Sequence, residues 1–338
     1  MRLALDAMGG DDAPRSMVQG AIDYASRHPD HQVILVGREP ELRSCLAAEG
    51  GARLTNVLFE HAPEVIGMSE KIAALKDRPN DSMNRTSLMV KEGRADAMVL
   101  CGNTGCSVAA AQLHLRRIPG VKRAGILVPL PNPRGYTWIC DGGANAVCRA
   151  EHLVQFAEMG SVFLELAEGV SKPKVGVLSI GEEDEKGVEL TMETRELLRA
   201  TKLNVVGNVE GHDIYTGELN VVVCDGFVGN IVLKTSEGVA EGIAKILKEE
   251  IYKGFWTKLG GALIKPAIRG LKRRVDWRHI GGCPLMGVDG VCIIGHGRSD
   301  RQAVHNALAQ AARFSSAKVV ERLREHFRST TASLAAVG

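Results

Sequence analysis

Small and polar residues follow a short apolar run at residues 98–100. The turn Cys101-Gly102-Asn103-Thr104-Gly105 separates that run from an alanine-rich segment that reaches Leu115. Glycines allow close backbone approach to a bound group, and the first N–H groups of a following helix are free donors for an oxyanion. Asn103 and Thr104 would add side-chain donors. The alternative is a plain strand–turn–helix connection in which Thr104 caps the helix.

Two further glycine-rich turns have the same character. In Asp225-Gly226-Phe227-Val228-Gly229-Asn230, we expect Asn230 at a helix start, with Lys234 one turn later. In Asp6-Ala7-Met8-Gly9-Gly10-Asp11, a carboxylate stands beside two glycines at the end of a strand. Helix capping is the alternative role for both turns.

Three basic side chains in other turns could bind phosphate. Lys186 follows four acidic residues, and His296 and Arg298 lie between glycines after the last apolar run. An arginine guanidinium offers fork-like donors that match phosphate geometry. The alternatives are a solvated helix start around Lys186 and a tight turn with exposed polar residues around His296.

Several well-known signatures are missing from the sequence. It contains no G-x-x-x-x-G-K-[ST], G-x-G-x-x-G after a strand, H-E-x-x-H or G-x-S-x-G. The formal net charge of +2 does not predict nucleic-acid binding by the surface as a whole. The eight cysteines form no C-x-x-C pair, so a zinc ribbon is not predicted. With no predicted signal peptide or membrane span, we expect a reducing cytoplasm, no metal and no cofactor.

Short apolar runs alternate with helical segments along the chain. They cover residues 3–5, 33–36, 98–100, 138–140, 175–180, 221–224 and 291–294. Such runs predict an α/β protein whose largely parallel sheet is covered by helices on both faces, with ligands beyond the carboxyl ends of the strands. We expect one unit over residues 1–328 and a frayed tail at residues 329–338.

Residues 248–278 combine apolar and basic side chains at helical spacing. Seven cations and no acidic residue lie between Ile251 and Val275, while Gly254, Gly260, Gly261 and Pro266 predict broken helices or a helical hairpin. We expect this segment to contact an acidic protein or an anionic membrane through Phe255, Trp256, Lys258, Lys265, Arg269, Lys272 and Arg273.

Taken in order, these turns resemble the phosphate acyltransferases of bacterial phospholipid synthesis, the PlsX family. The matching words include Asp6–Asp11, Gly102–Gly105, Gly207-Asn208-Val209-Glu210-Gly211, Asp225–Asn230 and Gly295-His296-Gly297-Arg298-Ser299. The resemblance spans residues 3–312. The sequence departs from the family pattern at Cys101, where Ala is usual, and at Asp81, where Ser is common.

The resemblance implies a three-layer αβα fold of two interleaved lobes, like the isocitrate/isopropylmalate dehydrogenases and phosphate acetyltransferases, in a homodimer. It implies transfer of an acyl group from acyl carrier protein to inorganic phosphate, with the product passing to a membrane glycerol-3-phosphate acyltransferase. Under this hypothesis Lys186 and Arg298 bind phosphate, and His296 protonates the leaving thiolate. The phosphate and oxyanion cradle is formed by Gly9, Gly10, Gly102, Asn103, Thr104, Gly105, Asn208, Asp225 and Asn230.

Three other functions remain open from the sequence. One is a phosphate acetyltransferase that uses acyl-CoA, and another is a metal-dependent hydroxy-acid dehydrogenase on the same fold. The third is a non-enzymatic module that binds membrane or nucleic acid, suggested by residues 248–278 alone.

Overall fold

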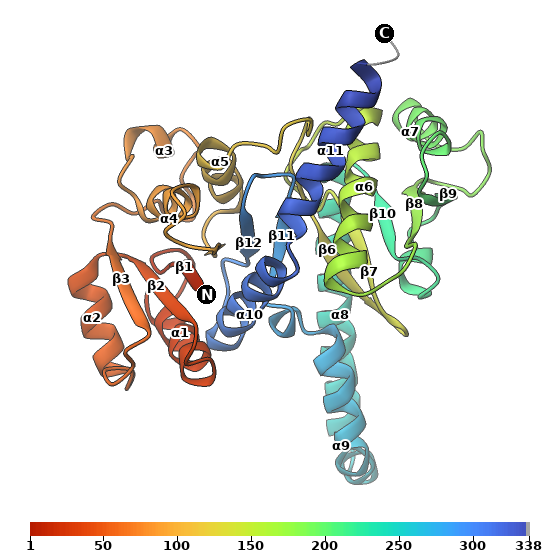
Figure 1. Ribbon diagram of the computed structural model, residues 1–338. Helices are drawn as coiled ribbons and strands as arrows, with labels where there is room; N and C mark the ends of the chain where they lie inside the picture. Colours follow the sequence, from red (N-terminus) through yellow and green to blue (C-terminus); the bar gives the residue numbers. More distant parts are fainter. Residues whose placement is uncertain (336–338) are drawn as a thin grey trace.

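Two sheets form the centre of the molecule, and the computed structural model describes residues 1–335 (Figure 1). The first sheet has the order β3 (Val57–His61), β2 (Gln32–Gly37), β1 (Arg2–Asp6), β4 (Ala97–Leu100), β12 (Val291–Gly295), β11 (Gly282–Met286), β5 (Gly125–Ile126). The second has the order β6 (Val128–Asn132), β7 (Gly135–Cys140), β10 (Val221–Val223), β8 (Lys174–Leu178), β9 (Asn204–Val209).

Most neighbouring strands run parallel, as the continuous apolar runs predict. The pairs β1–β2, β2–β3, β1–β4 and β4–β12 are parallel, as are β7–β10, β10–β8 and β8–β9. β11 is antiparallel to β12 and to β5, and β6 is antiparallel to β7. The chain therefore returns to the first sheet for β11 and β12 after it has built the second sheet.

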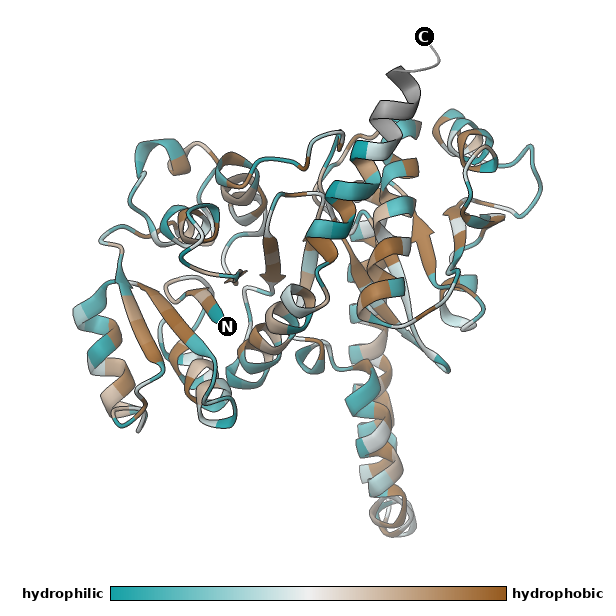
Figure 2. Cartoon of the chain, viewed as in Figure 1, coloured by the Kyte–Doolittle hydropathy of each residue, from teal (hydrophilic) through white to brown (hydrophobic). Residues whose placement is uncertain are grey.

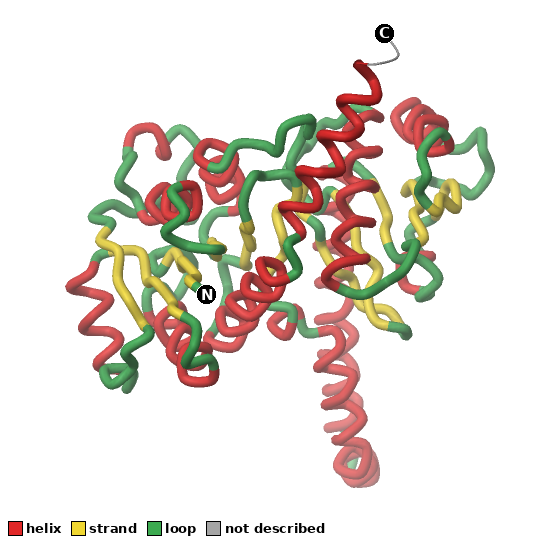
Figure 3. Tube along the Cα trace, in the orientation of Figure 1, coloured by secondary structure: helices red, strands yellow, loops and turns green. Residues whose placement is uncertain are grey.

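Helices cover both faces of the sheets, which confirms the three-layer, two-lobed α/β fold (Figure 3). Those joined to the first sheet are α1 (Arg15–Arg27), α2 (Glu39–Ala48), α3 (Ala74–Asp77), α4 (Ser82–Lys91), α5 (Thr104–His114), η2 (Trp277–His279) and α10 (Arg301–Ser316). The others are α6 (Ala150–Ala167), α7 (Glu189–Arg199), η1 (Asp213–Tyr215), α8 (Gly226–Tyr252), α9 (Phe255–Val275) and α11 (Val319–Ala335).

One hydrophobic core joins the two lobes. Phe163 of α6 packs edge to face on Trp138 of the second sheet, with 4.9 Å between ring centroids, and on Phe314 of α10, with 4.7 Å. Aromatic pairs at these distances add stabilisation beyond the area that they bury. The relative position of the two sheets is therefore fixed by packing rather than by a loose linker.

The two long helices α8 and α9 form a hairpin that projects from the body (Figure 1). The hairpin alternative predicted for residues 248–278 is confirmed, but the predicted breaks at Gly260, Gly261 and Pro266 are wrong. The chain turns at Lys253 and Gly254, between α8 and α9. Pro266 lacks an N–H group and removes one backbone hydrogen bond, and the 21-residue helix α9 tolerates this loss.

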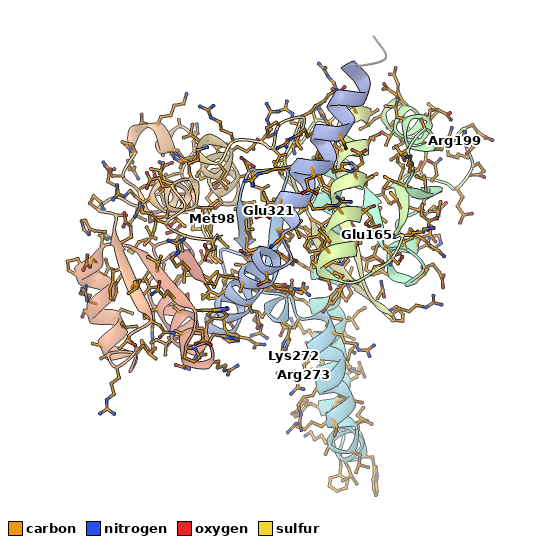
Figure 4. All side chains as sticks on the ribbon, in the orientation of Figure 1. Met98, Glu165, Arg199, Lys272, Arg273 and Glu321 are labelled. Carbon is orange, nitrogen blue, oxygen red and sulfur yellow. The ribbon has the colours of Figure 1, made fainter. Side chains whose placement is uncertain are left out.

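The frayed tail expected at residues 329–338 stays a prediction. Helix α11 continues to Ala335, and residues 336–338 lie outside the described part of the chain. Helices α6 and α11 lie side by side, and Figure 4 labels one residue on each, Glu165 on α6 and Glu321 on α11.

Candidate active site

The turns after β1, β4 and β12 meet backbone against backbone. A Cβ atom on Gly9 would lie 2.9 Å from the Gly102 nitrogen, so a larger residue would separate the first two turns. Gly10 has a φ of +103°, which favours glycine, and the Asp11 N–H donates to the Gly297 carbonyl at 2.8 Å. Three turns that are remote in the sequence thus form one surface, because β1, β4 and β12 are neighbours in the sheet.

The side chain of Asn103 builds this surface rather than facing a ligand. Its Oδ1 accepts from the Cys106 N–H at 3.0 Å, and its Nδ2 donates to the Met68 carbonyl at 2.7 Å. Asn103, not Thr104, is therefore the N-cap of α5. Thr104 and Gly105 are exposed in the first turn, and among residues 1–335 their backbone N–H groups have no hydrogen-bond acceptor. These N–H groups are the available donors for an anion.

Buried acids and thiols lie beneath the turns. Asp6 is fully buried, and burial raises its pKa, as it raises the pKa of the nearby Asp81 to about 6. Asp81 is the N-cap of α4 and accepts from the Met83 N–H at 2.8 Å. Burial also raises the pKa of Cys101 to about 12. A Cys101 thiol that stays protonated near neutral pH is a poor nucleophile.

Helix α8 reaches the same surface from the second lobe through Lys234. Its Nζ lies 3.3 Å from Nε2 of His296 and 2.8 Å from a carboxylate oxygen of Glu237. Nδ1 of His296 accepts from the Arg298 N–H at 3.1 Å, and burial first, then Lys234, lowers the histidine pKa. Because Nδ1 of the neutral His296 ring accepts a hydrogen bond, Nε2 carries the ring proton. Lys234 and this Nε2–H group can therefore both donate to an incoming anion. Arg298 is exposed and lies 3.9 Å from Glu241.

Asn230 lies one turn before Lys234 on α8 and is exposed. The expected capping alternative for Asn230 is wrong, because Asp225 is the N-cap and accepts from the Val228 N–H at 2.8 Å. A Cβ atom on Gly143 would lie 3.4 Å from the Cβ of Asn230. Since residues four apart share a helix face, Asn230 and Lys234 lie on one side of α8.

Asp141, which is not among the residues predicted for the site, organises the loop beside Asn230. Its carboxylate is fully buried and accepts from the backbone N–H groups of Ile126, Gly143, Ala144 and Asn145 and from the Asn145 amide, at 2.7–3.1 Å. A Cβ atom on Gly229 would lie 1.9 Å from the Asp141 carbonyl, so this loop fixes the start of α8. The signal in the sequence was an aspartate between a strand and a Gly-Gly-Ala-Asn turn.

Within residues 1–335, no hydrogen bond or ion pair joins Lys186 or Asn208 to the other predicted site residues. Lys186 lies in the loop after β8, which pairs with β10, and Asn208 lies in β9, the edge strand of the second sheet. The buried Asn208 donates to the carbonyl of Glu183 at 2.8 Å and that of Lys186 at 3.3 Å, so it holds the loop. Lys186 is exposed, and helix α7 begins only at Glu189, so the loop is not the expected helix start.

Within residues 1–335, no group of three or more His, Cys, Asp or Glu side chains is arranged to hold a metal ion. No helix in that range is long and apolar enough to cross a membrane. All eight cysteines lie in the described range as free thiols.

The two-lobed fold is shared with solved phosphotransacetylases. A phosphotransacetylase from Streptococcus pyogenes has a TM-score of 0.63 at 16% identity, over 95% of this chain and 94% of that one. The EutD phosphotransacetylase from Staphylococcus aureus has a TM-score of 0.59 at 16% identity, over 93% and 94%. These likenesses define the class of fold: the two-lobed α/β class that includes the phosphotransacetylases.

Sequence similarity goes further than fold. The chain is 44% identical to a phosphate acyltransferase from Pelotomaculum thermopropionicum, over 100% of this chain and 97% of the relative. It is 45% identical to a phosphate acyltransferase from Myxococcus xanthus, over 92% and 89%. Residues 1–322 match the family described as fatty acid synthesis protein, and the chain belongs to this family. The resemblance stated from the sequence motifs, and the assignment to the transferases, are confirmed.

Proposed function

We propose that this protein transfers a fatty acyl group from acyl carrier protein to inorganic phosphate, giving acyl phosphate and free carrier protein. The observation that carries the proposal is the similarity to phosphate acyltransferases over the whole chain. The phosphotransacetylase-like fold supports acyl transfer to phosphate as the reaction class. An acyl-CoA donor is the second candidate.

The reaction needs positioning more than an activated side chain. A phosphate oxygen attacks the thioester carbonyl, the C–S bond breaks, and the carrier thiolate leaves and takes up a proton. Because phosphate is itself the nucleophile, the protein must hold two anionic reactants together and stabilise the tetrahedral oxyanion. The high pKa of Cys101 fits a mechanism without a thiol nucleophile.

The donors gathered by the two lobes support specific roles. We place phosphate between Lys234, the Nε2 edge of His296 and Arg298, with the backbone N–H groups of Thr104 and Gly105 as further donors. Asn230 would contact the oxyanion from the same face of α8. Gly9, Gly10 and Gly102 allow the turns to meet, and Asn103, Asp225 and Asn208 act by holding loops.

Proton donation by His296 and phosphate binding by Lys186 stay predictions. The lowered pKa of His296 leaves the ring neutral near neutral pH, so it would protonate the thiolate only after phosphate binding has raised that pKa. Lys186 would bind an anion from the β8–α7 loop, where among the described residues it has no acidic partner.

The projecting hairpin supports self-association and contact with an anionic surface. Apolar side chains are exposed along both helices, among them Ile243 at 61% and Leu263 at 77%, and Figure 2 shows them interspersed with polar residues. Such faces are normally covered, so we assign them to a second copy of the chain in a homodimer. Phe255 and Trp256 form an exposed aromatic pair at the tip, and Lys272 and Arg273 lie on α9 near the body (Figure 4).

The cations of α9 would meet an anionic membrane or the acidic carrier protein. The proposed contact residues are Phe255, Trp256, Lys258, Lys265, Arg269, Lys272 and Arg273. Peripheral membrane contact from the cytoplasmic side would place the acyl phosphate near a membrane glycerol-3-phosphate acyltransferase.

The deciding experiment traps acyl phosphate with hydroxylamine after the protein is mixed with acyl carrier protein thioester and phosphate. We expect acyl hydroxamate that depends on phosphate, on the carrier thioester and on the protein. Hydroxamate formed with acyl-CoA but not with the carrier thioester would favour the second candidate. No hydroxamate with either donor would reject acyl transfer to phosphate.

A further inference from the structure

A basic pocket lies outside the site described above, between the α5–β5 connection and the start of α6. Arg117, Lys122, Arg123 and Arg149 line a cavity of about 570 Å³, together with Glu151 and His152. All four cations are exposed. Nothing in the proposed chemistry uses them.

The positive charge of the pocket is only partly neutralised. Glu151 pairs with Lys122, and the Arg117 guanidinium donates to the Lys122 carbonyl. Arg123 and Arg149 have no acidic partner among residues 1–335. Burial lowers the pKa of His152, whose Nδ1 accepts from the Arg149 N–H at 3.1 Å, so the ring adds no charge near neutral pH. Four cations therefore face one carboxylate.

The positive charge of Arg149 does not stabilise helix α6. This residue is the N-cap of α6, where the helix dipole favours an anion and disfavours a cation. The N–H groups of Ala150 and Glu151 in the first turn also have no acceptor in the described part of the chain. An anion bound in the pocket would accept hydrogen bonds from the free N–H groups of the first turn of α6 and would pair with the arginines.

The backbone around the pocket is held in place. Gln155 of α6 accepts from the Lys122 N–H at 2.7 Å and donates to the Gly120 carbonyl at 2.8 Å. The Ile118 N–H donates to the Gly287 carbonyl at 3.0 Å. The cations are therefore presented from a fixed frame rather than from a loose loop.

A single loop separates the pocket from Asn230. The Asn145 amide donates to the Ala124 carbonyl at 2.6 Å, next to Arg123. The carbonyl of the same Asn145 accepts from the Gly226 N–H at 2.8 Å, at the first turn of α8. Since Gly143 lies against Asn230, residues 141–145 connect the pocket to the proposed acyl-transfer site.

We infer that this pocket docks the acidic carrier protein, so that its acyl thioester enters beside residues 141–145. The inference rests on the proposed function. Exposed cations spread over a rim suit an extended acidic protein surface better than a small phosphate, which is usually held by converging donors. Val147 precedes Arg149 by two residues and is 84% exposed, so it offers an apolar contact close in sequence to the charged rim. The cations of the hairpin are then left for the membrane.

The test compares Arg123→Glu/Arg149→Glu with a control of equal charge change, Arg53→Glu/Lys202→Glu, whose side chains are exposed far from the pocket in sequence. Each is assayed with the acyl carrier protein thioester and with a small acyl thioester that lacks the protein. We expect the pocket variant to raise the KM for the carrier thioester by roughly tenfold or more at low salt, and less at high salt. Turnover of the small thioester should match that of the parent.

Any other pattern of KM values overturns the inference. An unchanged carrier KM in the pocket variant rejects it, as does an equal rise in the control. A raised KM for phosphate with an unchanged carrier KM would make the pocket a phosphate site instead. If the parent forms no acyl phosphate from either donor, the proposed function fails. Carrier binding measured by fluorescence anisotropy then still decides whether the pocket docks the carrier.

Discussion

Nζ of Lys234 and Nε2 of His296 lie 3.3 Å apart and join the second lobe to the turn after β12 in the first. The lysine comes from a helix and the histidine from a turn, and they approach only because the two sheets share one core. Thr104 and Gly105, whose N–H groups have no acceptor among residues 1–335, follow β4, the strand beside β12. Phosphate bound at the Lys234–His296 pair would be contacted by both lobes.

Removing this lysine should raise the pKa of His296. Burial and the Lys234 charge lower it in the parent, so Lys234→Met takes away one of the two main causes. The measurement is an NMR pH titration of the His296 ring, assigned with His296→Gln. Lys245→Met, on the exposed part of α8, is the control and should leave the titration unchanged. A His296 pKa that stays constant in Lys234→Met would mean that the contact is absent in solution.

Lys186→Ala and Asn230→Ala should each lower turnover strongly while the protein remains folded. Loss of one oxyanion or phosphate donor costs about 10²–10³ in rate. Cys101→Ala and Cys106→Ala are the matched controls and should retain most activity, since no thiol takes part. Turnover is measured by hydroxamate formation, with circular dichroism as the folding check. Near-normal rates in both variants would remove Lys186 and Asn230 from the site, and a dead but folded Cys101→Ala would indicate a thiol nucleophile.

Asp141→Ala should destabilise the protein severely. Five N–H donors would lose their acceptor in a buried loop, and breaking such a buried network costs on the order of 3–5 kcal/mol. The free energy of unfolding is measured in urea. Asp225→Ala, which removes a helix cap, should cost only about 1 kcal/mol. If Asp141→Ala does not fold, Asp141→Asn keeps one acceptor oxygen and should fall between the two; a loss no greater than that of Asp225→Ala would contradict this role.

Asp81 should make the protein less stable as pH rises through the acid range. Burial raises its pKa in the folded state to about 6, so the native protein binds more protons than the unfolded chain between roughly pH 4 and 6. Its contribution to stability is therefore greatest below this window and is lost as pH rises through it. Asp81→Ser keeps a capping side chain and removes the buried acid. Melting temperatures measured from pH 4.5 to 7.5 should fall less with pH in the variant than in the parent, and parallel curves would refute the assignment.

Charge reversal on the hairpin separates the two anionic surfaces proposed for it. Changing Lys265, Arg269, Lys272 and Arg273 to Glu should abolish co-sedimentation with anionic vesicles, because each cation near such a surface contributes about 1 kcal/mol. High salt should weaken parent binding in the same way. The dimer, checked by analytical ultracentrifugation, should persist. Loss of the dimer, or unchanged vesicle binding, would make these cations structural; a raised KM for the carrier thioester would place carrier docking here rather than at Arg123 and Arg149.

The sequence by itself determined the local elements and the family. Continuous apolar runs predicted parallel strands, and the polar turns after them predicted the ligand edge, because both patterns follow from burial and backbone conformation within a few residues. The ordered motifs from Asp6 to Ser299 identified the family. The basic, glycine-interrupted segment predicted a hairpin, although Pro266 proved compatible with a continuous helix.

Only the tertiary structure decided which turns meet and what each polar side chain does there. Gly9, Gly102 and Gly297 come together because β12 inserts beside β4 from the far end of the chain. Asn103 and Asn230 both follow glycines in the sequence. The Asn103 side chain is hydrogen-bonded to the backbone of Cys106 and Met68, whereas Asn230 is exposed on α8. In the sequence Asp141 does not differ from other turn aspartates, and only the structure shows that its carboxylate accepts five hydrogen bonds. Local patterns encode conformation, whereas hydrogen-bond partners and neighbouring charges depend on strand order and on the packing between lobes.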